Sequence, residues 1–181
     1  MGDGPTVHQT VRNVSAIPAQ QREWMRSWQR LGFRLRTADD AAVRRDIERL
    51  AREAAEPAFV HAFEQLETSV QRSDMWRYAV LWLDGGTYAD ADVLAHPPMA
   101  QLAAAHAQSG VVFTESLPVF DWMPPRVAAA VARAARGLGL TDLVRLPQRR
   151  NCLMIAPRRH PLMRRTLERI IAKFDAQRGE I

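Results

Sequence analysis

The chain has 181 residues, of which 47% are hydrophobic and 25% charged, a composition typical of one globular domain and unlike that of a disordered chain. No apolar run approaches the roughly 20 residues that a membrane helix needs, and the N-terminus lacks the pattern of a signal peptide. The single cysteine, Cys152, excludes an intramolecular disulfide. These features predict a soluble, cytoplasmic protein with a packed core.

The net charge of +5 is concentrated near the end of the chain, where residues 142–181 hold ten basic and four acidic side chains. Such a segment can attract a phosphate-bearing ligand or an anionic surface, and it can equally be the solvated face of a C-terminal helix. All but one of the 25 basic residues are arginine. Because this bias is typical of a bacterial genome rich in G and C, the charge alone does not predict a nucleic-acid partner.

The first part of the chain alternates β-prone and amphipathic segments. Trp24, Trp28 and Leu31 recur at spacings of three and four residues, which places them on one face of a helix. Apolar and basic side chains then alternate in the pattern of a half-buried strand. The expected elements are a strand over 6–14, a helix over 19–31, a strand over 33–37, a helix over 39–55 and a short helix over 59–66.

The next segment is apolar almost all round. Ser73 is a candidate N-cap for a helix over 74–83, which we expect to be buried, and Gly85-Gly86 ends that helix in a tight turn. The remaining expected elements are a strand over 87–94, a helix over 99–108, a strand over 110–114, a helix over 125–136, a strand over 151–156 and a helix over 161–177. Because strands and helices alternate, the sequence predicts an α/β fold with a mostly parallel sheet.

Two carboxylates lie near the end of the expected strand over 87–94. Asp90 and Asp92 are two residues apart, so in an extended chain they point to the same face. Unpaired carboxylates on a buried strand are expensive, and a divalent cation that also binds phosphate oxygens would neutralise them. Ligands of open α/β sheets bind at this end of the strands. An isolated Asp-x-Asp triplet is common by chance, however, and a turn with solvated acids is its more frequent explanation.

The residues before the pair add context. Asp74 and Arg77 share one helix face and can form a structural ion pair, but they also belong to an ordered string over residues 73–93. This string comprises Ser73-Asp74, Arg77-Tyr78, Gly85-Gly86, Tyr88 and Asp90-x-Asp92. It resembles the signature of the family 32 glycosyltransferases with a DXD sugar-binding region, which include outer-chain mannosyltransferases and bacterial capsule transferases. More distantly, it is similar to the catalytic core of the large glucosylating toxins.

Weaker similarities lie on both sides of the string. His8-Gln9-Thr10 resembles the opening strand of the family, Ser27-Trp28 resembles its "Ser-Trp" stretch, and Asn151 with residues 154–157 resembles a later segment. Family members usually extend further, with a β-rich segment after the last helix. We therefore expect this chain to be a C-terminally shortened member or part of a longer product.

The resemblance implies a GT-A type, Rossmann-like single domain over residues 1–181 that binds a UDP- or GDP-linked sugar and a divalent metal, Mn²⁺ or else Mg²⁺. It implies that Asp92 is the direct metal ligand and that Asp90 contacts the ribose or donor sugar and the metal shell. The other implied site residues are Asp74 and Arg77 at the donor sugar and phosphate, His8, Gln9, Thr10 and Tyr88 at the nucleotide, and Asn151 near the acceptor.

The leading hypothesis is a metal-dependent hexosyltransferase of bacterial polysaccharide biosynthesis that acts on a glycan, lipid or small-molecule acceptor and retains the anomeric configuration. Such an enzyme would lie in the cytoplasm, with peripheral association at the inner face of the membrane. Two alternatives remain open. One is a sugar-nucleotide-binding module without catalysis, and the other is a polyanion-binding protein that uses the basic C-terminal segment.

Overall fold

The computed structural model describes residues 4–108, 112–116 and 148–178, and the expected helix over 125–136 lies outside these ranges. The chain divides into two compact units. The first, which we call the main unit, comprises residues 1–112 and 152–181, and the second comprises residues 113–151. No helix among the described residues is long and apolar enough to cross a membrane.

A mostly parallel sheet forms the centre of the main unit. The strand order is β2-β1-β3-β5, with β1 (Thr6–Thr10) parallel both to β2 (Arg34–Ala38) and to β3 (Gly86–Ala89). β5 (Gln148–Ala156) runs antiparallel to β3, and β4 (Val112–Ser116) follows β5 in the strand order. This arrangement confirms the predicted α/β fold of GT-A type.

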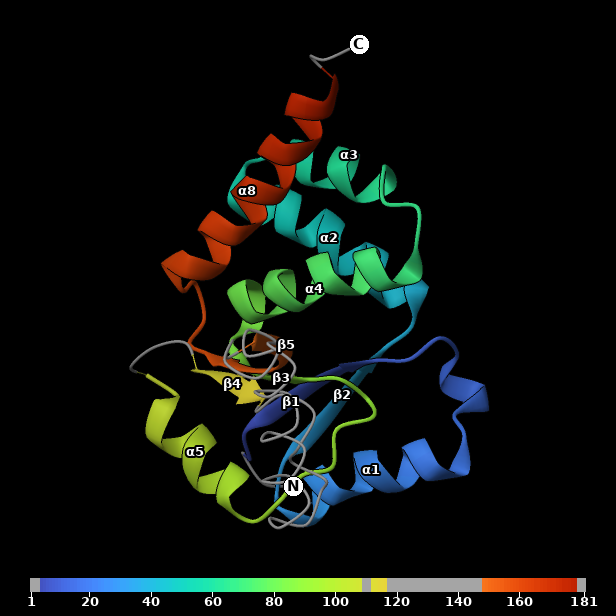
Figure 1. The fold of residues 1–181 in the computed structure, drawn as a ribbon, viewed down its shortest axis with the longest axis vertical. Helices are drawn as coiled ribbons and strands as arrows, with labels where there is room; N and C mark the ends of the chain where they lie inside the picture. The colour runs from blue at the N-terminus through green and yellow to red at the C-terminus, as the bar shows by residue number, and fades with distance from the viewer. Residues whose placement is uncertain (1–3, 109–111, 117–147, 179–181) are drawn as a thin grey trace, which may run out of the picture. The chain divides into compact units, whose positions relative to one another are not determined.

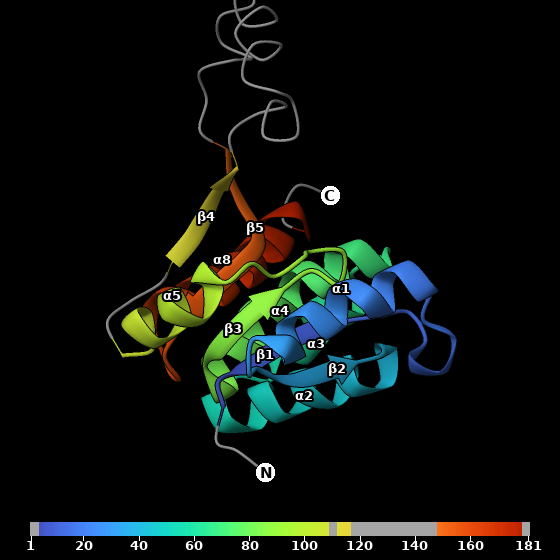
Figure 2. The ribbon, with the colours of Figure 1, turned by 90° about the horizontal axis from the view of Figure 1, so that it is seen from below.

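Helices cover both faces of the sheet (Figures 1 and 2). On one face lie α1 (Ala19–Arg30) and α5 (Pro98–His106), whose apolar side chains pack with strand residues around the fully buried Val7 and Trp28. The other face carries α2 (Asp40–Ala54), α3 (Ala58–Glu64), α4 (Ser69–Asp84) and α8 (Pro161–Arg178). The β1 residues therefore alternate between two buried layers, because successive strand side chains point to opposite faces.

Three predicted boundaries lie furthest from the observed ones. α4 begins at Ser69 and not near Ser73, because Thr68 and Gln71 form a capping box that satisfies the free backbone N–H groups. β3 ends at Ala89 and not at residue 94, because the Val93 N–H donates to the Asp90 carbonyl at 3.0 Å and closes a turn. β1 ends at Thr10 and not at residue 14, and a 3₁₀ turn capped by the Asn13 side chain follows over Val14–Ala16.

The connection from α4 to β3 requires two glycines. Gly85 and Gly86 have φ angles of 68° and 97°, which L side chains rarely adopt. A Cβ on Gly85 would lie 2.5 Å from the Arg158 backbone nitrogen, and one on Gly86 would lie 2.8 Å from the Thr6 carbonyl oxygen. The Gly85-Gly86 pair thus allows the buried α4, which is apolar as predicted, to lead directly into β3.

Candidate functional site

The two aspartates lie in the loop that follows β3, at the edge where the carboxyl ends of the parallel strands meet. Asp90 is half-buried and Asp92 is exposed. The sequence predicted both on a strand, but they occupy a turn that begins at Asp90. They are nevertheless near neighbours, since the charge of Asp92 raises the pKa of Asp90. We call residues 90–95 the acidic loop.

The Asp90 carboxylate is held by two buried side chains of the main unit. The Tyr88 hydroxyl donates to Asp90 Oδ1 at 2.5 Å, and Arg77 Nη2 lies 3.6 Å from the same oxygen. Arg77 also pairs with Asp74 at 2.7 Å, and its guanidinium lies 4.9 Å from the centre of the Tyr88 ring. The structure therefore brings Asp74, Arg77, Tyr88 and Asp90 into one network.

Burial and the neighbouring groups set the electrostatics of this network. Burial raises the pKa of Asp90, whereas the Tyr88 hydrogen bond and the Arg77 charge lower it, and the charges of Asp92 and Asp74 raise it. Burial also raises the pKa of Tyr88, so its hydroxyl remains a donor. A cation placed at Asp90 and Asp92 would relieve their mutual repulsion.

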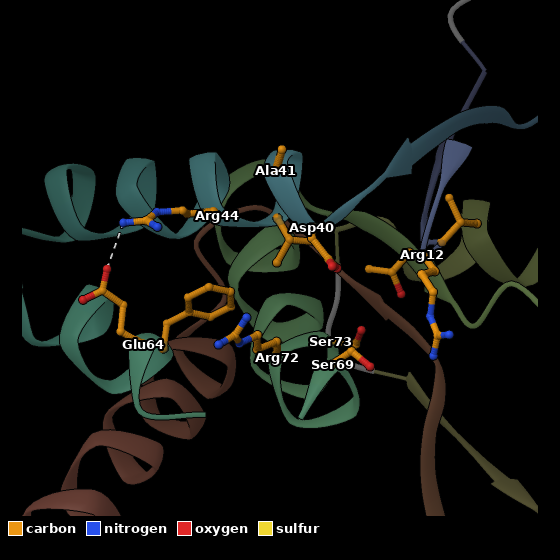
Figure 3. Close-up of a pocket in the computed structure, with 12 residues that line it drawn as sticks. Arg12, Asp40, Ala41, Arg44, Glu64, Ser69, Arg72 and Ser73 are labelled. Carbon is orange, nitrogen blue, oxygen red and sulfur yellow. Dashed lines mark hydrogen bonds and ion pairs between the residues drawn. The ribbon is translucent and has the colours of Figure 1, made fainter. Parts of the chain in front are cut away.

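A cavity of about 550 Å³ opens beside this network, at the carboxyl end of β1 and the N-terminal ends of α2 and α4 (Figure 3). Thr10, which the resemblance places at the nucleotide, is one of its lining residues. Ser73 also lines it, and the Ser73 carbonyl accepts a 3.5 Å hydrogen bond from Arg77 Nε, so one turn of α4 joins the cavity to the acidic network. Its other lining residues are Val11, Arg12, Asp40, Ala41, Val43, Arg44, Phe63, Glu64, Ser69 and Arg72.

Three arginines make the wall of this cavity basic. Arg44 pairs with Glu64 at 2.9 Å, and the Arg72 guanidinium lies 5.6 Å from the centre of the Phe63 ring. Within the described residues, no hydrogen bond or ion pair holds the exposed Arg12 guanidinium. Figure 3 shows Arg12, Asp40 and Ser73 around the same opening. A cavity with these groups suits a polar, phosphate-bearing ligand.

The charged residues of this cavity were not predicted from the sequence. Arg12 and Asp40 follow the ends of β1 and β2, so the rule that ligands bind at the carboxyl ends of parallel strands could have identified them. Arg72 carries no comparable signal, because its place in the wall depends on α4 beginning one turn earlier than predicted.

His8 and Gln9 lie away from the cavity. His8 is 1% exposed, its Nε2 donates to the Gly85 carbonyl at 2.9 Å, and burial lowers its pKa to about 4. It lines a separate hollow near the amino ends of the strands, together with Arg34 and Asp84.

Gln9 faces the α1 side of the sheet and donates to the Asp90 carbonyl at 3.2 Å. Asn151 lies on β5, but its side chain is not among those that the structure describes, so its predicted role near the acceptor stays a prediction.

The basic C-terminal segment is partly neutralised by internal contacts. Arg158 and Arg159 both pair with Glu53, and Arg164 pairs with Glu168 at 2.6 Å. The Arg159 guanidinium also lies 3.8 Å from the centre of the Trp82 ring. These arginines therefore help to attach α8 and the residues before it to α2 and α4.

The carboxylates of Asp90 and Asp92 suit a hard divalent cation whose other ligands come from a bound molecule. Among the described residues, no three His, Cys, Asp or Glu side chains gather in a group that could hold a metal. In many Mg²⁺ or Mn²⁺ sites the protein supplies only two accessible carboxylates, and substrate phosphates supply further ligands. Asp92 supplies such an exposed carboxylate, and Asp90 lies beside it.

The mostly parallel sheet, with an acidic pair and a basic cavity at its carboxyl edge, defines an α/β protein whose candidate ligand site lies at the carboxyl ends of its strands. The family model described as glycosyltransferase sugar-binding region containing DXD motif matches residues 16–109, just over half of the chain. The chain therefore belongs to this glycosyltransferase family, which confirms the resemblance. The matched range contains Asp74, Arg77 and Asp90-Ala91-Asp92, whereas residues 8–10 and Asn151 lie outside it. Searches of curated proteins and of solved structures found no match.

Proposed function

We propose that the chain is a metal-dependent glycosyltransferase that takes a hexose from a UDP- or GDP-linked sugar and transfers it, with retention of configuration, to a glycan, lipid or small-molecule acceptor. The observation that carries this proposal is the link from Asp90, two residues before the exposed Asp92, through Arg77 and Ser73 to a basic cavity. A basic cavity and an acidic pair are the groups that a diphosphate and the cation bound to it require. The enzyme would act in the cytoplasm, at the inner face of the membrane.

Each part of the site has a role in this proposal. The cavity lined by Thr10, Arg12 and Ser73 receives the nucleoside and directs the diphosphate toward the acidic loop. Asp92, supported by Asp90, holds the divalent cation, preferably Mn²⁺. When bound, the cation stabilises negative charge on the diphosphate. Arg77 is too deeply buried to be a freely moving cation, so it orients Asp74 and Asp90 toward the hydroxyls of the donor sugar.

The chemical step replaces one bond at the anomeric carbon by another. The bond between the anomeric carbon and the phosphate oxygen breaks, and the electron pair stays on the diphosphate. The acceptor hydroxyl forms the new carbon–oxygen bond on the same face, and its proton passes to the departing phosphate oxygen. This front-face route needs no carboxylate nucleophile, and the residues of the network serve to position the reactants.

The test is turnover with a panel of UDP- and GDP-sugars in the presence of Mn²⁺, for the unmodified chain, Asp92→Asn and the exposed control Glu23→Gln. We expect Asp92→Asn or a chelator to lower turnover by at least about 100-fold, because the cation contributes several kcal/mol of charge stabilisation. The control should keep full turnover. Turnover that neither the chelator nor Asp92→Asn reduces would refute the proposal.

Binding without turnover would also overturn the transferase assignment. If UDP or GDP with Mn²⁺ raises the melting temperature and no sugar is released or transferred, the chain is a sugar-nucleotide-binding module. Binding of a polyanion that weakens steeply with salt and is unchanged in Asp92→Asn would instead assign function to the basic segment.

A further inference from the structure

The backbone of the acidic loop is held by three polar side chains from the α1 side of the sheet. Gln9 Nε2 donates to the Asp90 carbonyl at 3.2 Å, and Trp28 Nε1 donates to the Val93 carbonyl at 3.0 Å. The Ser27 hydroxyl accepts a 2.8 Å hydrogen bond from the Ala95 N–H. The Asp90 carboxylate, by contrast, is held by Tyr88 and Arg77.

Burial shows that these three side chains are not incidental surface contacts. Gln9 and Trp28 are fully buried, and Ser27 is 4% exposed. Among the described residues, Gln9 Oε1 has no hydrogen-bond partner, so this amide carries a desolvation penalty that an apolar side chain would avoid. The contact that distinguishes Gln9 from an apolar residue is its bond to Asp90. Ser27 is fixed in turn, because its hydroxyl donates to the Trp24 carbonyl at 2.5 Å.

The remaining contacts of the loop leave Asp92 as the exposed residue between fixed neighbours. The Asp90 N–H donates to the Cys152 carbonyl at 2.8 Å, and the Val93 N–H donates to the Asp90 carbonyl. The Ala91 side chain is buried in a cluster with Val11 and Met25. The backbone is therefore fixed on both sides of Asp92 without any ligand.

We propose that Gln9, Ser27 and Trp28 are positioning residues that keep the acidic loop in its cation-binding conformation before the cation and nucleotide arrive. The inference rests on the proposed function, since it assumes that Asp92 binds the cation. A loop that already has the cation-binding conformation binds the cation with higher affinity, because no free energy is spent on ordering the loop. It also gives a role to the Ser27-Trp28 pair, which neither the cavity nor the acidic network includes.

The first part of the test measures the loop itself. Ser27→Ala and Trp28→Phe each remove one hydrogen bond to the loop, and Trp82→Phe is a matched control on α4 that leaves the loop bonds intact. Native-state amide hydrogen exchange is followed at Val93 and Ala95. We expect exchange there to be about tenfold faster in the two loop variants, as for the loss of one hydrogen bond. The control should alter exchange only by its effect on global stability.

The second part measures cation affinity by the electron paramagnetic resonance signal of free Mn²⁺, with UDP or GDP present. We expect Ser27→Ala and Trp28→Phe to weaken apparent Mn²⁺ affinity by about tenfold or more, as for other residues that orient metal ligands. Trp82→Phe should bind Mn²⁺ as the unmodified chain does, even if it unfolds at a lower denaturant concentration. A merely structural role would lower stability in all three variants and leave affinity unchanged.

The outcomes separate the two proposals. If the unmodified chain binds Mn²⁺ and the loop variants bind it equally well, the positioning role is refuted and the proposed function stands. Unchanged exchange at Val93 and Ala95 in both loop variants would refute it as well. If the unmodified chain binds no Mn²⁺ with either nucleotide, the proposed function fails, and the positioning role fails with it.

Discussion

The Tyr88 hydroxyl donates to Asp90 Oδ1 at 2.5 Å, so an aromatic residue inside β3 controls the carboxylate that follows the strand. This bond lowers the pKa of Asp90 against the opposing effect of burial. We predict that Tyr88→Phe raises the pKa of Asp90 further. Because a carboxylate must be ionised to bind a cation, the acidic limb of Mn²⁺ binding then moves to higher pH.

The measurement is apparent Mn²⁺ affinity with UDP or GDP as a function of pH. We expect the affinity of Tyr88→Phe to fall by about tenfold at acidic pH, the size expected for one hydrogen bond to a charged group. The same variant at alkaline pH, where Asp90 is ionised in both proteins, is its own control. An unchanged profile would show that the hydroxyl does not act through the protonation of Asp90.

His8 makes stability depend on pH. Its pKa is lowered from 6.5 to about 4 by burial, so the folded state favours the neutral ring. The stability that this provides is present above pH 6.5 and is lost as the pH falls toward 4. The difference amounts to about 3 kcal/mol.

This prediction is checked by denaturant unfolding of the unmodified chain and of His8→Gln at neutral and acidic pH. Glutamine can still donate to the Gly85 carbonyl but cannot take up a proton. We expect His8→Gln to lose less stability on acidification than the unmodified chain. Parallel pH profiles for the two proteins would contradict the assignment to His8.

Asp46 joins α2, β2 and α4 through a buried carboxylate. Both of its oxygens lie 2.7 Å from Arg36 Nη2, and Trp76 Nε1 donates to Oδ2 at 2.7 Å. We predict that Asp46→Ala lowers the free energy of unfolding by about 3 kcal/mol, because it leaves a buried indole N–H unpaired and removes the nearer of the two carboxylates that bind the Arg36 guanidinium, the other being Asp84 at 3.3 Å. The exposed pair of Glu23 and Arg30 serves as the comparison, and Glu23→Ala should cost less than about 1 kcal/mol. Equal losses in the two variants would argue against the buried network.

Gly85 and Gly32 separate the effect of backbone strain from that of steric contact. Both have positive φ angles, but a Cβ on Gly32 meets no atom within 4 Å, whereas one on Gly85 would lie 2.5 Å from Arg158 N. We predict that Gly32→Ala costs about 1 to 2 kcal/mol, the strain of the left-handed conformation. Gly85→Ala must also displace the backbone before α8, so thermal unfolding should show a clearly larger loss. Similar melting temperatures for the two variants would contradict this account.

Much of the fold follows from local patterns in the sequence. The spacing of Trp24, Trp28 and Leu31 correctly placed α1, and the apolar run after Met75 correctly indicated a buried helix. The end of β3 was mistaken because it depends on a backbone hydrogen bond from Val93 to Asp90. The start of α4 was mistaken because it depends on a cap at Thr68 that lies outside the apolar pattern. Periodicity does not report these interactions.

The candidate site was only partly predictable. The proximity of Asp74 and Arg77 follows from helical spacing, and their approach to Asp90 is consistent with the ordered string. The charged cavity was not predicted, because Arg12, Asp40 and Arg72 come from three segments that only the folded sheet brings together. The bonds from Gln9, Ser27 and Trp28 to the acidic loop span 65 to 81 residues of sequence, a separation that local reasoning does not bridge.

One uninterrupted stretch of chain, from the start of α4 through Gly85-Gly86 and β3 to Asp92, supplies one side of the cavity wall, the buried arginine and both acids. Its length is therefore as constrained as its composition. Deleting a single residue between Ser73 and Arg77 would rotate the Arg77 side chain relative to Ser73 by about 100° about the axis of α4, the angle per residue of an α-helix. A substitution in this stretch leaves that register intact, whereas a deletion or insertion within α4 would not.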